Sequence, residues 1–384
     1  MRMTLSASYK APQSKPTVLV VDDEAGPRDA LKVILRPFFN IRLAENARTA
    51  MNILKEEPID LITLDQKLPD RHGIDLLQDI KHDHADIEVI IITGYGSLKS
   101  AMEGLKYGAA GYLLKPFNVA ELVSLINQTI EKKQRLDLIR TILQDPSSSL
   151  WGPESDCARG WKFLKTAYFA IGSKEDETAC DGSSPQDILP LLSDLLEAKD
   201  RQLLNHSSRV SFYATLLANR LNLTGVEQKS LALGAFLHDI GEIGPLPDRK
   251  PGSGSLSAVQ SPYSNVHADN GARMILPLGL PAEVSQIISC HQEHWDGTGY
   301  PYGLQGEGIP LLARIVGIAQ MFDELTAEIP GRTPLSIDKA IRQISLHAHT
   351  HFDPRLTALF AHVAEECKVS LPAMAVSGTP NSAH

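Results

Sequence analysis

Cysteine is scarce in this sequence. Its 384 residues include four cysteines, none of them in a Cys-x-x-Cys pair: Cys157, Cys180, Cys290 and Cys367. Without paired cysteines we expect neither a disulfide-stabilised scaffold nor a cysteine-based zinc finger, and the chain suits a reducing compartment. We therefore predict a cytoplasmic protein.

Positive charge and long apolar segments are also limited. The 37 Lys and Arg residues are outnumbered by 46 Asp and Glu residues, which gives a net charge of −9. This balance argues against a protein that mainly coats nucleic acid, and no basic stripe or helix-turn-helix pattern suggests DNA binding. No apolar run approaches the roughly 18 residues that a membrane-spanning helix needs, and the first residues carry no apolar signal core. We expect no DNA binding and no membrane insertion.

The length of the chain predicts two or three domains, at roughly 150 residues per domain. Changes in composition and periodicity divide the sequence into five segments. These are a flexible arm at 1–16, an α/β domain at 17–130, a helical linker and irregular connection at 131–187, an all-α domain at 188–370 and a disordered tail at 371–384.

Strands and helices alternate through the α/β domain. The expected strands lie at 17–23, 41–43, 60–65, 88–93 and 111–114, and the expected helices lie at 28–37, 47–55 and 98–107 or begin near 73 and 119. Continuous apolar runs such as VLVV and VIII are typical of strands that are buried on both faces. The alternation predicts a doubly wound, five-stranded parallel sheet of the flavodoxin-like type.

The last helix of this domain continues past its expected end. Its apolar positions recur at mostly helical spacing, at Leu122, Ile126, Ile130, Leu136, Ile139 and Leu143. Two interpretations fit this pattern: a linker helix that pairs with a second copy and forms a homodimer, or a helix that packs on its own domain.

Acidic residues follow two of the buried strands. Asp22 and Asp23 come after the first, and Asp65 comes after the third. These carboxylates should meet at the carboxyl edge of the sheet, where such folds bind ligands, and Mg²⁺ is the usual cation for such a cluster. Thr93 and Lys115 follow two further strands. A hydroxyl and an ammonium beside a cluster of acids and metal suit phosphoryl transfer to Asp65.

Residues 16–130 resemble the response-regulator receiver domain. The matching motifs are VLVVDDE at 18–24, DQKLPD at 65–70 with Gly73, Thr93-Gly94 and Lys115-Pro116. The resemblance implies that Asp65 accepts a phosphoryl group from a histidine kinase, that Asp22 and Asp23 bind Mg²⁺ together with it, and that Tyr112 is an aromatic switch. Thr93 and Lys115 then hold the phosphoryl oxygens. His72 departs from the family, which usually has an aspartate before the glycine.

Histidines with neighbouring acids distinguish the all-α domain. His238 is followed directly by Asp239, and His206, His267 and His291 lie in separate apolar-periodic segments. A lone histidine on an apolar face is usually a core residue, but imidazole and carboxylate side by side suit Fe, Mn or Zn. Such ions lower the pKa of a bound water and produce a nucleophile for phosphate esters.

Residues 188–365 resemble the HD-GYP family, which hydrolyses cyclic di-GMP at a site of two or three metals. The matching motifs are HSSRV at 206–210, HDIGEIG at 238–244, His267 with Gly271, HQEHWDGTGYP at 291–301 and HFDP at 351–354. The resemblance implies that the metal ligands are His206, His238, Asp239, His267 and His291, with Asp239 part of the catalytic machinery. It also places Arg314 and Tyr300 at the nucleotide, with Arg314 on a phosphate.

Several positions depart from the HD-GYP pattern. Glu242 replaces an expected lysine, Gln292 replaces the second histidine of a pair, Gln320 replaces an aspartate that completes the metal site, and Gln202 replaces an occasional acid. Glutamine is a neutral and weak ligand. A glutamate in place of a lysine also repels a phosphodiester that the lysine would attract.

Two hypotheses therefore stay open for the output domain. In the first, Glu242 or Glu293 supplies a missing ligand, and the domain hydrolyses cyclic di-GMP under the control of Asp65 phosphorylation. In the second, the domain is a scaffold that binds a protein or nucleotide without cleaving it. A Glu242 side chain turned outward, together with a Gln320 hydrogen-bonded to protein, would favour the scaffold.

Overall fold

The computed structural model describes residues 15–94, 103–105, 107–144, 150, 154–171, 185–244, 266–328 and 332–367. The chain divides into two compact units, described separately below. The first comprises Met1–Leu138 and Ala167–Glu177, and the second comprises Ile139–Thr166 and Thr178–His384. Among the described helices, none is long and apolar enough to cross a membrane.

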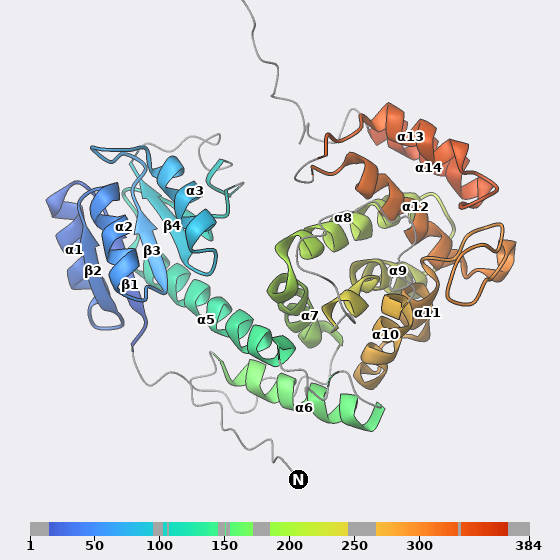
Figure 1. Ribbon diagram of the computed structural model, residues 1–384, viewed down its shortest axis with the longest axis horizontal. Helices are drawn as coiled ribbons and strands as arrows, with labels where there is room; N and C mark the ends of the chain where they lie inside the picture. Colours follow the sequence, from blue (N-terminus) through green and yellow to red (C-terminus); the bar gives the residue numbers. More distant parts are fainter. Residues whose placement is uncertain are drawn as a thin grey trace, which may run out of the picture. The chain divides into compact units, whose positions relative to one another are not determined.

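A five-stranded parallel sheet forms the first unit, with the strand order β2-β1-β3-β4-β5 (Figure 1). The strands are β1 (Thr17–Val21), β2 (Asn40–Ala44), β3 (Leu61–Leu64), β4 (Glu88–Thr93) and β5 (Gly111–Leu114). The surrounding helices are α1 (Ala25–Leu35), α2 (Ala47–Glu56), α3 (Gly73–Asp83) and α5 (Val119–Gln144). The predicted doubly wound sheet is confirmed.

Both faces of this sheet are covered, which explains the unbroken apolar runs of its strands. Along β1, Leu19 and Val21 pack with residues of α2 and α3, whereas Val18 and Val20 pack with residues of α1 and α5. Because successive side chains of a strand point to opposite faces, a strand buried on both sides needs an apolar residue at every position.

Several boundaries differ from the predicted ones. Helix α1 begins at Ala25 rather than near Arg28, with Glu24 as its N-cap residue directly after Asp22 and Asp23. Of the helix predicted at 98–107, residues 103–105 are helical and most of the others lie outside the described residues. The predicted N-terminal arm, except for its last two residues, and the whole predicted tail also lie outside them.

The irregular connection predicted to follow the linker helix within residues 131–187 is wrong in its central part. Helix α6 (Glu154–Ala170) occupies it, and α7 (Pro185–Lys199) begins before its end. Trp161 and Leu164 of α6 are buried, and Trp161 Nε1 donates a hydrogen bond to the Met274 carbonyl oxygen at 2.8 Å. The helix was missed because its apolar spacing is short and flanked by glycine, serine and proline, whereas packing against distant residues stabilises it.

Helices make up the regular structure described in the second unit, as predicted for an all-α domain. After α7 come α8 (Arg201–Ala218), α9 (Gly225–Leu237), α10 (Val266–Ile275), α11 (Ala282–Cys290), α12 (Leu311–Thr326), α13 (Ile337–Leu346) and α14 (Pro354–Cys367). Short 3₁₀ turns lie between them: η2 (Ile240–Ile243), η3 (Leu276–Leu278) and η4 (Gly306–Gly308). Helices α8, α9, α11, α12, α13 and α14 share one apolar core, which holds the elements that carry His206, His238 and His291.

Candidate functional sites

Three carboxylates gather at the carboxyl edge of the sheet in the first unit. Ligand oxygens of Asp22, Asp23 and Asp65 all lie within 4.8 Å of one another, a spacing that suits one cation. Asp22 and Asp65 are buried, whereas Asp23 is exposed. The parallel register of β1 and β3 brings these strand ends side by side.

Lys115 closes this cluster. Its Nζ donates hydrogen bonds to Asp22 Oδ2 at 2.7 Å and to Asp65 Oδ2 at 2.8 Å. Partial burial disfavours the ammonium, but the hydrogen bonds to both carboxylates outweigh burial and raise the pKa of Lys115. Thr93 is fully buried at the end of β4, and Tyr112 on β5 packs at the edge of the core beneath α2 and α3. The structure thus gathers Asp22, Asp23, Asp65 and Lys115, and places Thr93 at a neighbouring strand end.

Gly73 and His72 have structural roles next to Asp65. A Cβ atom at Gly73 would clash with the Asp65 carbonyl oxygen and lie 2.7 Å from the Gln66 Cα, so only glycine allows α3 to begin this close to the acid. The ring of His72, which had no assigned role, caps α3: its Nδ1 accepts a hydrogen bond from the Ile74 N–H at 3.3 Å. His72 thus acts as the N-cap residue of α3, at the position where the receiver family usually has an aspartate.

In the second unit, one carboxylate lies among four histidines. Asp239 Oδ2 is 3.2 Å from His238 Nε2 and 3.6 Å from His206 Nε2. Asp239 Oδ1 is 3.5 Å from both His267 Nε2 and His291 Nε2. Each oxygen therefore faces one pair of histidines, and each pair with Asp239 meets the spacing needed for a cation. All five predicted ligands are brought together.

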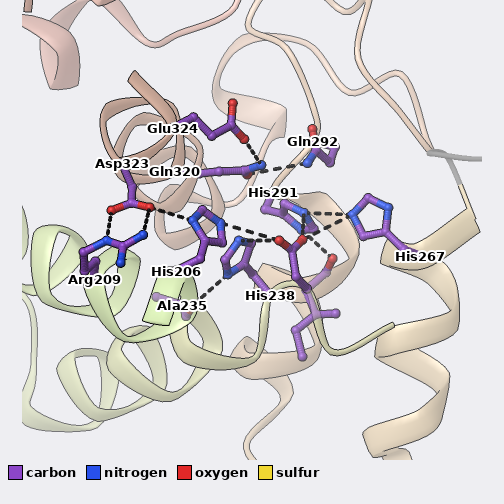
Figure 2. A network of polar contacts seen from close by, with 12 residues as sticks. His206, Arg209, Ala235, His238, His267, His291, Gln292, Gln320, Asp323 and Glu324 are labelled. Atoms are coloured by element: carbon purple, nitrogen blue, oxygen red, sulfur yellow. Dashed lines mark hydrogen bonds and ion pairs between the residues drawn. The ribbon is translucent and has the colours of Figure 1, made fainter. Parts of the chain in front are cut away.

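Three of the histidines, His238, His291 and His206, have a hydrogen-bond partner at Nδ1 (Figure 2). The partner of His206 is described below. Nδ1 of His238 bonds the Ala235 carbonyl at 2.7 Å, and Nδ1 of His291 bonds the Ile288 carbonyl at 2.8 Å. A carbonyl only accepts, so each Nδ1 carries the hydrogen and, in a neutral ring, Nε2 presents its lone pair to Asp239. His238 Nε2 is buried without a hydrogen bond, a cost that a coordinated cation would remove.

Electrostatics also favour a cation between these groups. Burial opposes the charge of Asp239, but its histidine neighbours outweigh burial and hold its pKa well below the usual value. Burial lowers the pKa of His291 to about 4, while Asp239 overcomes burial at His238 and raises the pKa of that ring. His267 Nε2 and His291 Nε2 lie 3.3 Å apart, a contact that two lone pairs cannot make without a proton or a metal between them.

Two glycines allow the elements that carry these ligands to meet. A Cβ atom at Gly241, in the HDIG motif, would clash with the His267 carbonyl oxygen. One at Gly271 would lie 3.0 Å from the Gly241 nitrogen. Backbone of η2 therefore rests directly on backbone of α10, which brings Asp239 to His267.

Asp323 is a residue of this site that the sequence analysis missed. It is buried on α12, accepts a hydrogen bond from His206 Nδ1 at 2.7 Å, and pairs with Arg209 Nε at 2.5 Å (Figure 2). Burial opposes its charge, but the bonds from His206 and Arg209 outweigh it and lower the pKa of Asp323. A carboxylate that orients a ligand histidine in this way is a common feature of metal sites. Its place one helical turn after Gln320 was the available signal.

The glutamines at two departing positions are hydrogen-bonded to protein. Gln320 Nε2 donates to Glu324 Oε1 at 2.9 Å, and Gln292 Nε2 donates to Gln320 Oε1 at 3.5 Å (Figure 2). Burial is the largest influence on the pKa of Glu324 and raises it. One of the two conditions that favour the scaffold is thus met. Glu242 lies on η2, where its charge contributes to the raised pKa of His238.

The remaining candidates have other contacts. Glu293, considered as a ligand, instead supports the glycine loop: its carboxylate accepts the backbone N–H groups of Tyr302 at 2.7 Å and Leu304 at 2.9 Å. Arg314, considered as a phosphate contact, pairs with Asp353 at 2.7 Å and lies over the Trp295 ring. These pairings were hidden because each joins residues that are distant in sequence or separated by a loop.

Tyr300 and Gln202 also lie in ordinary structural settings. The Tyr300 N–H donates to the Gln292 carbonyl oxygen at 3.2 Å, which ties the glycine loop to the end of α11. Gln202 is exposed in the first turn of α8, where its N–H donates to the side chain of Asp200. The contacts described for them are hydrogen bonds of loop closure and helix capping, which fit a structural role.

Two family models match the two parts of the chain that carry these clusters. A response regulator receiver domain matches residues 18–127, and an HD domain matches residues 190–356. The chain therefore carries a receiver domain followed by an HD domain. The receiver domain carries the Asp65 cluster, and the HD domain carries the Asp239 cluster.

Several curated relatives match most of the chain, across the ranges of both domains. A probable cyclic di-GMP phosphodiesterase of Vibrio cholerae is 28% identical over 90% of this chain and 77% of its own length. A cyclic di-GMP phosphodiesterase of Thermotoga maritima is 27% identical over 91% of both chains. The cyclic di-GMP phosphodiesterase response regulator RpfG of Xanthomonas campestris is 26% identical over 88% of this chain and 85% of its own.

Solved structures of receiver domains match part of the chain. One is the signal receiver domain of an HD domain-containing protein from Pseudomonas fluorescens, with 27% identity and a TM-score of 0.31. It covers 31% of this chain and 98% of its own. Another, a CheY-like receiver domain from Methanospirillum hungatei, has 30% identity and a TM-score of 0.31 and covers 32% of this chain and 98% of its own.

Proposed function

We propose that the HD domain hydrolyses a phosphodiester bond of cyclic di-GMP and that phosphorylation of Asp65 controls this activity. The observation that carries the proposal is Asp239, each of whose oxygens faces a pair of histidines. The names of the relatives that match about nine tenths of the chain support the choice of nucleotide.

The donor set fits one cation on each side of Asp239. His206 and His238 would hold one, and His267 and His291 the other, each pair sharing the carboxylate. Two imidazoles with one carboxylate suit Fe or Mn. When bound, such ions polarise a phosphoryl oxygen and make water more acidic. Glu242 is a proposed additional ligand, because it lies one turn after His238 and adds negative charge near that ring.

The residues of the chain prepare this site for cations before any bind. Nδ1 contacts with Ala235, Ile288 and Asp323 fix the rings of His238, His291 and His206. The low pKa of His291 keeps its ring neutral, and the low pKa of Asp239 keeps its carboxylate charged. His291 and Asp239 in these protonation states bind a metal without first releasing a proton, whereas the raised pKa of His238 favours a proton that a metal would displace.

A turnover assay with the full chain tests this function. We expect the purified protein to convert cyclic di-GMP to a linear product or GMP with Mn²⁺ or Fe²⁺, and to cleave 3′,3′-cGAMP more slowly. The Asp239→Asn variant, which keeps the shape but removes the shared charge, should lose activity by at least about 100-fold. No turnover with either ion, or equal turnover by the variant, would contradict the proposal.

The comparison with 3′,3′-cGAMP is needed because other relatives act on that nucleotide. The 3'3'-cGAMP-specific phosphodiesterase 3 of Vibrio cholerae is 32% identical over 44% of this chain. Faster cleavage of 3′,3′-cGAMP than of cyclic di-GMP would support the proposed hydrolysis but contradict the proposed substrate.

A scaffold without activity is the second candidate. It is favoured by Gln292 and Gln320, which stand where the HD-GYP resemblance implies a histidine and an aspartate. Gln292 is hydrogen-bonded to Gln320, and Gln320 to Glu324. Less than about one metal per chain, together with no turnover, would establish the scaffold.

For the receiver domain we propose Mg²⁺ at Asp22, Asp23 and Asp65, and a histidine kinase as the phosphoryl donor. Asp65 attacks the phosphorus of the donor, and the bond from phosphorus to the donor nitrogen breaks. Lys115 and the Thr93 hydroxyl then contact the new phosphoryl oxygens. Because Lys115 already bonds Asp65 at 2.8 Å, it is in place to do so. We also propose that α5 of two chains can pair and so transmit the signal from the receiver domain to the HD domain.

A further inference from the structure

Gln320, Gln292 and Glu324 form one hydrogen-bonded group at the HD site (Figure 2). Gln320 and Glu324 are four residues apart on α12, so their side chains lie one above the other on the same face. Asp323, which holds the ring of His206, is on this side of the helix as well. The group therefore lies beside the half of the site formed by His206, His238 and Asp239.

The glutamate determines how the Gln320 amide is turned. A carboxylate without a proton offers only hydrogen-bond acceptors, so the group that Gln320 presents to Glu324 must be its NH₂. The observed contact is of this kind, from Nε2 to Oε1 at 2.9 Å. The carbonyl oxygen of Gln320 then points away from Glu324, on the side from which Gln292 Nε2 approaches at 3.5 Å.

We propose that Gln320 Oε1 is an oxygen ligand for the cation beside His206 and His238, and that Glu324 is the positioning residue that keeps this oxygen turned toward the site. The inference rests on the proposed metal site. Amide oxygens coordinate divalent cations, and the 3.5 Å contact with Gln292 is long enough to be given up easily.

The pair also restores the lost charge. An aspartate at position 320 would bring one negative charge, and glutamine brings none. Glu324 lies a single turn farther along α12 and is hydrogen-bonded to Gln320 at 2.9 Å, so its ionised carboxylate places one negative charge beside that amide. Together the two side chains offer an oxygen and a charge, the two properties that the aspartate would have combined.

Calorimetric titration of the metal-free full chain with Mn²⁺ tests this role without measuring activity. In Glu324→Ala the Gln320 amide is free to turn, and we expect the affinity for one Mn²⁺ to fall by about 10-fold. Glu365→Ala, the same change at an exposed position of α14, should bind Mn²⁺ like the unchanged protein.

A rescue variant separates positioning from general damage. Gln320→Asp combined with Glu324→Ala should bring Mn²⁺ affinity back to within about 3-fold of the unchanged protein, because aspartate carries both the oxygen and the charge. Gln320→Asp alone should gain less, because its carboxylate then meets that of Glu324. If Glu324→Ala does not fold, Glu324→Gln takes its place, with a smaller loss expected.

The outcomes distinguish this inference from the proposed function. If the unchanged protein binds no Mn²⁺, the metal site itself is overturned and this inference falls with it. If it binds Mn²⁺ and Glu324→Ala binds equally well, or the aspartate does not rescue, only the role of Gln320 and Glu324 is overturned.

Discussion

The receiver and HD sites are electrostatic opposites. In the receiver domain one ammonium, Lys115, lies between two carboxylates at 2.7 and 2.8 Å. In the HD domain one carboxylate, Asp239, lies among four imidazoles at 3.2 to 3.6 Å. Lys115 thus gives both buried carboxylates of the receiver cluster a charged partner, whereas the HD cluster leaves a buried nitrogen of His238 without a hydrogen bond. The HD domain should depend more strongly on a cation for its stability.

The two sites differ in completeness as well. Each residue that the receiver resemblance requires is present, and the one departure, His72, caps a helix. The HD site departs at Glu242, Gln292 and Gln320, side chains that would contact metal or nucleotide. The departures from the expected patterns that affect such side chains therefore lie in the HD site, whereas the receiver site keeps its expected acids, threonine and lysine.

The largest expected effect tests whether the two sites are independent. Asp65→Asn removes the nucleophile, so incorporation of phosphate from a small phosphodonor should fall by more than about 100-fold. Mn²⁺ content of the HD domain should stay unchanged in the same preparation. A loss of metal from the HD domain in this variant would show that the receiver site and the HD site are linked.

The next effect concerns the frame of the HD site. Gly241→Ala places a methyl group against the His267 carbonyl oxygen, and we expect it to cost about 3 kcal/mol and lower Tm by about 10 °C. Gly225→Ala is the matched control, because nothing lies within 4 Å of an added Cβ there. Equal melting of the two variants would contradict the backbone contact inferred here.

A smaller effect is expected from the carboxylate behind His206. Asp323→Asn weakens the bond to His206 Nδ1 and leaves Arg209 without its partner, so Mn²⁺ affinity should fall between 10- and 100-fold. Asp269→Asn, on the exposed surface of α10, is the control. Titration calorimetry measures both, and an unchanged affinity would remove Asp323 from the site.

The smallest effect is the pH dependence of the metal-free protein. The folded pKa of His291, about 4, is below its unfolded value of 6.5, so its contribution to stability is present above pH 6.5 and is lost as pH falls toward 4. The raised pKa of His238 acts in the opposite direction and offsets part of this loss.

Tryptophan fluorescence can assign this loss to one domain. All three tryptophans, Trp151, Trp161 and Trp295, belong to the second unit, so urea unfolding followed by their emission reports on that unit alone. The urea midpoint should be lower at pH 5 than at pH 7.5, and His291→Asn should reduce the difference. An unchanged midpoint would contradict the pKa assigned to His291.

The sequence predicted what depends on local pattern. Continuous apolar runs identified the strands of the sheet, and acids at their ends identified the Asp65 cluster, because a parallel sheet brings such ends to one edge. The HD motif identified Asp239 and its histidines. These features depend on spacing within short segments, which a sequence displays directly.

What was missed depends on contacts between distant segments. Helix α6 is held by Trp161, which bonds to Met274 more than a hundred residues away. Asp323 reaches His206 across a similar separation. Glu293 has the composition of a ligand, but the backbone N–H groups that return past it in the glycine loop take both of its oxygens. Only the folded chain reveals which of several acids faces the histidines.

The contact of Gly241 with the main chain of α10 has a consequence for how this domain tolerates change. Because the spacing between Asp239 and His267 is set by two backbones in contact, it does not depend on the side chains at positions 242, 292 or 320. Those positions can therefore be replaced while the distance between the two halves of the site stays constant. If lysine, histidine and aspartate were introduced at these three positions, the spacing between Asp239 and His267 would not need to change.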